Sequence, residues 1–193
     1  MTVYTFPREA LNAPAASVVS GVRNSRTVQS ELLLLPNTCG IPKGFEGLIL
    51  SLSPTLTKKQ ARSGAYLLPA DLGEKYPVSF VYITSHISGG SLHQYLSENL
   101  QKYHERLFFI ILPLHHRFLL PCPDGAGTAL SEAESRELQM RTTVHDSEEF
   151  QCRCCFAEEQ SRAWVYLFDD ENTIRKKTEL AEKIGISHCV VFM

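Results

Sequence analysis

The chain has 193 residues, of which 44% are hydrophobic and 21% are charged, and its formal net charge is -2. This composition is that of a folded globular protein and excludes extended disorder over most of the chain. The near-neutral charge gives no support to a nucleic-acid-binding protein or to electrostatic attachment to an anionic membrane. For this length, we expect residues 1–193 to form a single domain.

The N-terminal sequence MTVYTFPREALNAP has no basic patch followed by an apolar core, so we predict no secretory signal. The longest strongly apolar run, Leu107 to Leu114, is far shorter than the roughly 20 residues that cross a bilayer as a helix. No membrane span is therefore predicted. We expect a cytoplasmic protein whose six cysteines are reduced.

Short apolar runs alternate with polar, helix-compatible stretches, which is the pattern of a parallel sheet covered by helices. Several runs are apolar at every position, so both faces of these strands are expected to be buried. The expected strands are Val3 to Phe6, Leu32 to Leu35, Leu48 to Leu52, Val78 to Thr84, Leu107 to Leu112 and Cys189 to Phe192. The sequence therefore predicts an α/β fold with a mainly parallel sheet.

The clearest strand, helix, strand unit lies in the middle of the chain. Gly89 and Gly90 mark the turn after its first strand, and Ser91 is the expected N-cap of a helix over residues 92–103. This helix leads into the strand that begins at Leu107. A connection of this kind between parallel strands is right-handed.

Residues 121–168 have a different pattern. The turn-rich sequence PCPDGAGTALSEAESREL leads into a short helix, and FQCRCCFAEEQSRAWVYLF predicts two strands joined at Glu158 to Ser161. We expect this segment to be a small antiparallel insertion on the main sheet.

Three cysteines of the insertion, Cys152, Cys154 and Cys155, raise the question of a zinc site with His145 or Cys122 as a further ligand. Structural zinc sites favour cysteines separated by two to four residues on a turn, which a Cys-x-Cys-Cys run inside a strand does not provide. Alternate residues of a strand share a face, so we interpret these cysteines as small buried apolar residues and predict no metal.

The sequence gives little support to a cofactor site or to a catalytic nucleophile. The stretch SHISGGS places two glycines before a helix but lacks the rest of a phosphate-binding pattern, so we interpret it as an ordinary helix start. The sequence contains no Gly-x-Ser-x-Gly elbow and no P-loop run. No cofactor is predicted.

The C-terminal sequence WVYLFDDENTIRKKTELAEKIGISHCVVFM repeats the strand, helix, strand scheme. Asp169 or Asp170 is expected to cap the helix, and Gly185 is expected to end it. The chain then closes on the strand from Cys189 to Phe192.

Over its C-terminal half, the order of elements resembles the last quarter of family 18 glycoside hydrolases, in particular the chitinase-like and spore-cortex branch. Pro113 matches the family's proline after a barrel strand, and Asp169, Asp170, Ile174 and Lys177 match the start of a family helix. The resemblance implies a relative of the (β/α)8 barrel whose chain ends with the closing strand of the barrel.

The chain departs from this family at the catalytic residues. The family's Asp-x-x-Asp-x-Asp-x-Glu run, whose glutamate protonates the glycosidic oxygen, does not occur in the sequence. His115 and His116 stand in place of a family tyrosine and glycine, and Phe192 is the best match to the closing tryptophan. The 193 residues also fall short of the roughly 200 to 250 of a full barrel. We therefore expect a partial or degenerate TIM-like barrel without catalytic residues of the family type.

A barrel with missing strands leaves unpaired backbone at an edge, which a folded protein must cover or pair. One expectation is that the N-terminal segment up to Arg26 packs over the gap. The other is a homo-oligomer whose subunits pair through the open edge.

A candidate cleft lies at the ends of the expected parallel strands, where barrels and open α/β sheets bind their ligands. The candidate residues are Tyr82, Thr84, His86, His115, His116 and Phe192. The alternative is that His115 is a core histidine with hydrogen-bond partners and that His116 is a solvated loop residue.

The function predicted from the sequence is a non-catalytic protein on a glycoside hydrolase-like scaffold, which binds a glycan or a protein partner in this cleft. The alternative is a hydrolase with a remodelled site, in which His115 or His86 is the general base and a carboxylate such as Asp124 or Glu74 is its partner. A carboxylate within hydrogen-bond reach of either histidine would favour the alternative.

Overall fold

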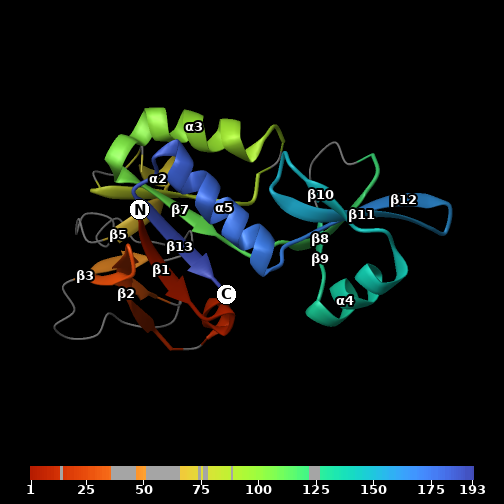
Figure 1. Cartoon of the computed structure of the whole chain (residues 1–193), viewed down its shortest axis with the longest axis horizontal. Helices are drawn as coiled ribbons and strands as arrows, with labels where there is room; N and C mark the ends of the chain where they lie inside the picture. Colours follow the sequence, from red (N-terminus) through yellow and green to blue (C-terminus); the bar gives the residue numbers. More distant parts are fainter. Residues whose placement is uncertain are drawn as a thin grey trace.

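The computed structural model describes residues 1–13, 15–35, 47–50, 66–73, 75, 78–87, 89–121 and 127–193. Within this part of the chain, the strands form a closed barrel of eight and a separate sheet of five. Figure 1 shows the barrel with its helices on the left and the second sheet projecting from it on the right.

The barrel has a mixed strand order. Around the wall, the strands are β1 (Thr2–Phe6), β13 (His188–Phe192), β7 (Leu107–Ile111), β6 (Phe80–Thr84), β5 (Tyr66–Pro69), β4 (Leu48–Leu50), β3 (Arg26–Leu34) and β2 (Ser17–Arg23). The two pairings that involve β2 are antiparallel, and the other six are parallel. Because the second sheet is antiparallel throughout, the expected mainly parallel arrangement holds for the barrel and not for the whole chain.

All six expected strands contribute to the barrel wall, although residues 51–52 of the third one lie outside the described residues. The sequence did not predict β2 and β5, and these two strands complete the closed wall. The gap that we expected in the barrel is therefore absent from the described strands. The segment up to Arg26 closes the wall as β1 and β2 and does not pack over a gap.

Two layers of apolar side chains explain why several strands are apolar at every position. In β7, Phe108 and Ile110 point into the barrel, whereas its other residues face the helices outside. Inside the barrel, Phe6 stacks on Phe192 with ring centroids 5.4 Å apart, and Tyr4 stacks on Phe108 at 6.1 Å. The barrel interior is thus a packed core, as expected for eight strands.

Helices α3 (Leu92–Tyr103) and α5 (Glu171–Ile184) cover β6, β7 and β13. Both begin and end where the sequence predicts. The Ser91 hydroxyl accepts a hydrogen bond from Gln94 N at 3.2 Å, and Asp170 caps α5. Gly185 ends α5 with a φ of 103°, a left-handed conformation that glycine adopts without strain.

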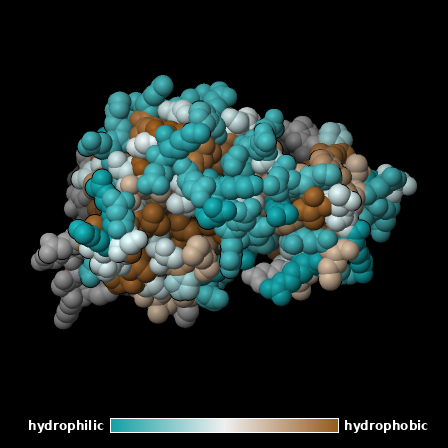
Figure 2. Space-filling model, in the orientation of Figure 1, coloured by the Kyte–Doolittle hydropathy of each residue, from teal (hydrophilic) through white to brown (hydrophobic). Residues whose placement is uncertain are grey.

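Three short helices complete the barrel: η1 (Arg8–Asn12), α2 (Ala70–Gly73) and η2 (His104–Arg106). η1 joins β1 to β2, and Val18 and Val22 on the outer side of β2 are 48% and 44% exposed. Figure 2 shows hydrophobic residues reaching the barrel surface beside the hydrophilic helices.

The second sheet lies between β7 and α5 in the sequence. Its strand order is β10 (His145–Ser147), β11 (Cys152–Glu159), β12 (Arg162–Phe168), β8 (His115–Leu119) and β9 (Thr128–Ala129). The predicted hairpin is β11 and β12, and α4 (Glu132–Arg141) packs on one sheet face through Leu138. The sheet begins at His115, whereas the sequence placed the start of the insertion near residue 121. A homo-oligomer stays a prediction, and the unpaired edges among the described strands are β9 and β10.

No helix among the described residues combines the length and the apolar character that crossing a bilayer requires.

Candidate functional site

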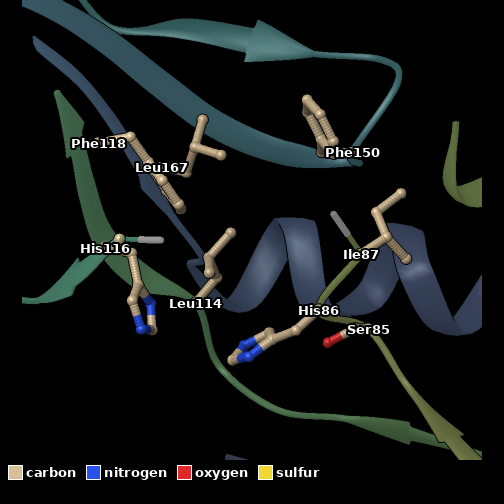
Figure 3. A pocket seen from close by; sticks show the side chains of 9 residues that line it. Ser85, His86, Ile87, Leu114, His116, Phe118, Phe150 and Leu167 are labelled. Atoms are coloured by element: carbon tan, nitrogen blue, oxygen red, sulfur yellow. The ribbon is translucent and has the colours of Figure 1, made fainter. Parts of the chain in front are cut away.

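A cleft of about 270 Å³ opens where the end of the barrel meets the second sheet. It lies beyond the carboxyl ends of β6 and β7, the edge at which barrel enzymes bind their ligands. The residues that line it are Ser85, His86, Ile87, Leu114, His116, Phe118, Gly127, Phe150 and Leu167. They come from the segment after β6, from β8 and the residue before it, from the residue before β9, from the turn before β11 and from β12. Figure 3 labels eight of them.

Two histidines from different parts of the fold meet in this cleft. His86 follows β6 of the barrel, and His116 lies in β8 of the second sheet. Their rings are edge to face, with centroids 5.6 Å apart, and extend toward the same space in Figure 3. His116 Nδ1 is buried and has no hydrogen-bond partner among the described residues. A buried polar nitrogen in a cleft is a position at which a ligand or water can bind.

The surroundings favour the neutral form of both imidazoles. Desolvation lowers the pKa of His86, and the neighbouring His116 and Lys177 lower it further, although Asp169 and a hydrogen bond to the Leu112 backbone oppose this effect. Desolvation also lowers the pKa of His116. A neutral imidazole carries one donor and one acceptor nitrogen, and in His86 one of the two is already engaged by the Leu112 backbone.

Ser85 fixes the barrel side of the cleft. Its hydroxyl donates to Leu112 O and accepts from Leu112 N, both at 3.1 Å, and its own N–H donates to Ile110 O at 2.9 Å. These bonds tie the end of β6 to the end of β7. The backbone that carries His86 is held in place as a result.

A buried ion pair holds the second sheet against the barrel. Lys177 Nζ lies 2.7 Å from Asp169 Oδ1 and 2.6 Å from Oδ2, and both side chains are almost completely buried. The carboxylate also accepts hydrogen bonds from the Thr173 hydroxyl and from Leu114 N, each at 2.9 Å. The Asp169 N–H also donates to Leu114 O. Leu114 and Asp169, which flank the second sheet in the sequence, are therefore joined by one backbone and one side-chain hydrogen bond.

The opposite wall of the cleft is apolar. Phe118 and Leu167 project from neighbouring strands of the second sheet, and Phe150 faces them from the turn before β11 (Figure 3). A Cβ at Gly127 would lie 2.5 Å from the Phe118 ring, so a larger residue at this position would have to displace that ring. A mostly apolar cleft with a few converging polar groups is typical of ligand sites.

Of the six candidate residues, the structure brings His86 and His116 together in the cleft. Thr84 is half-buried at the end of β6. Tyr82 lies in the barrel core, where burial and the nearby Asp71 raise its pKa to about 12. These positions follow from the alternation of side chains along each strand.

Two further candidates lie outside the cleft. Phe192 is 0% exposed inside the barrel, so it cannot form the aromatic floor that we expected. His115 points to the other face of the second sheet, where its Nδ1 lies 3.2 Å from the hydroxyl of the buried Ser135. His115 therefore matches the alternative of a core histidine with a partner.

The sequence did not indicate Ser85, Phe118, Phe150 and Leu167 as site residues. The strand pattern predicted Leu167 only as part of a hairpin and gave no indication that the hairpin folds back against the barrel. The carboxylates proposed as partners for a histidine base, Glu74 and Asp124, lie outside the described residues.

The cysteines of the second sheet are buried, as their strand pattern predicts. Cys152 is 1%, Cys154 is 9% and Cys155 is 0% exposed. Burial raises the pKa of Cys152 to about 12, with a further increase from Asp169 and an opposing effect of Lys177. Such thiols behave as small apolar residues.

Comparison with known proteins places the fold in a structural class. No protein-family model and no curated protein matches the sequence. The solved structure of the spore cortex-lytic enzyme SleL from Bacillus cereus matches with a TM-score of 0.50 and 14% identity, over 75% of this chain and 44% of that one. SleL from Bacillus megaterium QM B1551 matches with a TM-score of 0.47 and 16% identity, over 75% of this chain and 37% of that one. A chitinase from Chromobacterium violaceum ATCC 12472 matches with a TM-score of 0.48 and 13% identity, over 76% of this chain and 50% of that one.

The chain spans about half or less of the length of these three proteins. The structural resemblance to a spore-cortex protein that the sequence predicts is confirmed for the fold by the match to SleL from Bacillus cereus. The protein is an α/β barrel of this type with a small antiparallel sheet inserted before its last helix and strand.

Proposed function

We propose that this protein binds a glycan or a protein partner in the cleft between the barrel and the second sheet, without cleaving it. The observation that carries the proposal is the meeting of His86 and His116 in an apolar cleft, with His116 Nδ1 buried and unpaired among the described residues. Two neutral imidazoles supply hydrogen bonds to a polar ligand, and the apolar wall supplies contact area.

The chemistry of the cleft argues against a glycosidase. Protonation of a glycosidic oxygen requires a positioned carboxylic acid. None of the nine described residues that line the cleft is an aspartate or a glutamate, and the family acid motif is missing from the sequence. The nearby Asp169 already accepts hydrogen bonds from Lys177, Thr173 and Leu114, so it is not an available acid.

The histidine pair also supports a second candidate, a hydrolase with a remodelled site. Because their pKa values are lowered, His86 and His116 are neutral near pH 7 and could accept a proton from water or a hydroxyl group. The described residues place no carboxylate in the cleft to orient either ring. We therefore rank this candidate second.

The test is a calorimetric titration of the purified protein with the N-acetylglucosamine hexamer, a neutral glycan. His116→Ala should weaken binding about tenfold or more, because it removes a hydrogen-bonding group at the buried end of the cleft. The matched control is His93→Ala, which removes an exposed histidine of α3 and should leave the affinity unchanged. Equal affinities for His116→Ala and the unmodified protein would contradict the proposed site.

A further inference from the structure

A second cavity, which we call the basal cavity, lies at the opposite end of the barrel from the cleft. Its wall includes the first residues of three parallel strands, Thr2 of β1, Phe80 of β6 and His188 of β13. In Figure 1 the chain begins at this end of the barrel, away from the second sheet. The cavity has a volume of about 730 Å³. Small-molecule sites have volumes of about 300 to 1,000 Å³, so the basal cavity has the size of such a site.

A histidine of the barrel lines the basal cavity. The His188 ring lies flat on that of Phe108, with centroids 4.4 Å apart and an interplanar angle of 7°, and meets Phe80 edge to face at 5.9 Å. These two contacts hold the plane of the imidazole. His188 Nδ1 is buried and has no hydrogen-bond partner among the described residues. Buried polar nitrogens are normally hydrogen-bonded, so this ring is suited to a partner that enters from the cavity.

Two arginines line the same cavity. Arg23 is the last residue of β2, and Arg106 is the last residue of η2. The Arg106 guanidinium donates to Val78 O at 2.6 Å and to Ser79 O at 3.1 Å, so the backbone before β6 holds it in place. Both acceptors are neutral carbonyl groups. The ion pairs between described residues include neither arginine, so both charges are available to a ligand.

Positive charge exceeds negative charge in the basal cavity. Its two carboxylates are Glu105 and Glu182, and Glu182 Oε1 already lies 3.5 Å from the Met1 ammonium. When this ion pair is set aside, two guanidinium groups face one carboxylate. The cations also act on the histidine, because desolvation lowers the pKa of His188 and the Met1 ammonium and Arg23 lower it further. The imidazole is therefore neutral at neutral pH and has one N–H to donate.

We propose that the basal cavity binds a small organic oxyanion, either a phosphate or a carboxylate, between Arg23, Arg106 and His188. Guanidinium groups match the oxygen atoms of both kinds of anion, and the histidine N–H supplies a further hydrogen bond. Phe80 and Ile186 give part of the wall an apolar character, which suits the organic part of the ligand. The site is separate from the cleft and is independent of the function proposed for it.

The test is a titration of the whole protein with phenyl phosphate and with benzoate, followed by the histidine ring signals in NMR spectra. Benzyl alcohol is the neutral control. The His188 signals should shift with one or both anions but not with benzyl alcohol, and the signals of His86 and His116 in the cleft should stay unchanged. A shift with only one of the anions would identify the phosphate or the carboxylate as the group that the site binds.

Two variants test the residues of the site by calorimetry with the anion that binds. Arg23→Gln changes an exposed side chain and should weaken binding about fivefold. His188→Phe keeps a ring on Phe108 but removes the N–H donor, so it should weaken binding about tenfold. Arg162→Gln is the matched control, because it removes the same charge from an exposed position of β12 in the second sheet.

Three results would overturn the proposal. The first is that neither anion shifts the His188 signals. The second is that benzyl alcohol binds as well as the anions, which would show an apolar pocket without selection for charge. The third is that Arg162→Gln weakens binding as much as Arg23→Gln, which would show a general effect of net charge and not a site.

Discussion

The ammonium group of Lys177 lies 2.6 Å from Asp169 Oδ2, and neither side chain is more than 1% exposed. Lys177 is on α5, behind the barrel wall, and Asp169 is the residue at which the second sheet returns to the barrel. The pair therefore links the two parts of the fold beside the cleft. A buried charge without its partner is strongly unfavourable, so the two residues depend on one another.

Removal of the lysine should destabilise the protein. In Lys177→Met, the Asp169 carboxylate keeps its bonds to Thr173 and Leu114 but loses its counter-charge. We expect the free energy of unfolding in urea to fall by about 3 to 5 kcal/mol. The double variant Lys177→Met/Asp169→Asn should recover part of this loss, because the amide oxygen still accepts a hydrogen bond. A single variant as stable as the unmodified protein would contradict the role of the pair.

The histidine pair should make stability depend on pH. The folded-state pKa values of His86 and His116 lie below the ordinary value of 6.5, so between the two values the unfolded chain binds more protons. The free energy of unfolding should therefore fall as the pH is lowered through about 6.5 and level off below the folded-state values. His188 also has a lowered pKa, so the comparison needs a variant that isolates the pair.

His116→Gln is this variant. It should flatten the pH dependence in part and raise the pKa of His86, because a protonated His116 no longer opposes protonation of its neighbour. Lys177 and Asp169, the other charged groups that act on His86, are unchanged by the substitution. Histidine ring signals in NMR spectra report each titration. A His86 midpoint that is the same with and without His116 would show that the rings are not coupled.

Phe192 should act in stability and not in binding. Phe192→Ala removes the ring that stacks on Phe6 inside the barrel, so we expect a loss of about 3 to 5 kcal/mol in the free energy of unfolding. At a temperature where the variant is folded, its affinity for the hexamer should equal that of the unmodified protein. If the folded Phe192→Ala variant bound the hexamer more weakly, Phe192 would have a role in binding and this prediction would be wrong.

The buried thiols should be unreactive in the native state. Cys152, Cys154, Cys155 and Cys189 are buried, so an alkylating reagent should modify them only after unfolding. Mass spectrometry of peptides after brief labelling identifies each modified cysteine, and labelling in urea is the control. Rapid native labelling of Cys152 or Cys154 would show that the second sheet opens in the folded protein and would contradict this prediction.

The parts of the fold that the sequence predicted are those with strong local signals. β7 is apolar at all five positions, and both long helices have a capping residue at the expected position. β2 has weak signals, because all of its residues except Gly21 are half-buried or exposed and a bulge between Ser20 and Val22 interrupts the pattern. Whether the barrel closes depends on this strand, so the sequence pattern left the closure undecided.

The candidate site was predictable only in part. The position of His86 after a parallel strand follows from the apolar pattern. His115 and His116 point to opposite faces of the second sheet because they are consecutive residues of a strand, and the sequence had not predicted that strand. The position of Lys177 in the sequence could have indicated the buried ion pair. It lies on the inward stripe of α5 between Ile174 and Ala181, and a lysine at such a position predicts a buried acidic partner.

The most direct test of the proposed function follows the histidine NMR signals of the protein during prolonged incubation with the N-acetylglucosamine hexamer. We expect the His86 and His116 signals to shift on addition of the hexamer and then to stay constant, with the sugar signals showing an intact hexamer. Cleavage of the hexamer by the unmodified protein but not by His116→Ala would establish the hydrolase instead. Unchanged signals of both histidines would contradict glycan binding in the cleft.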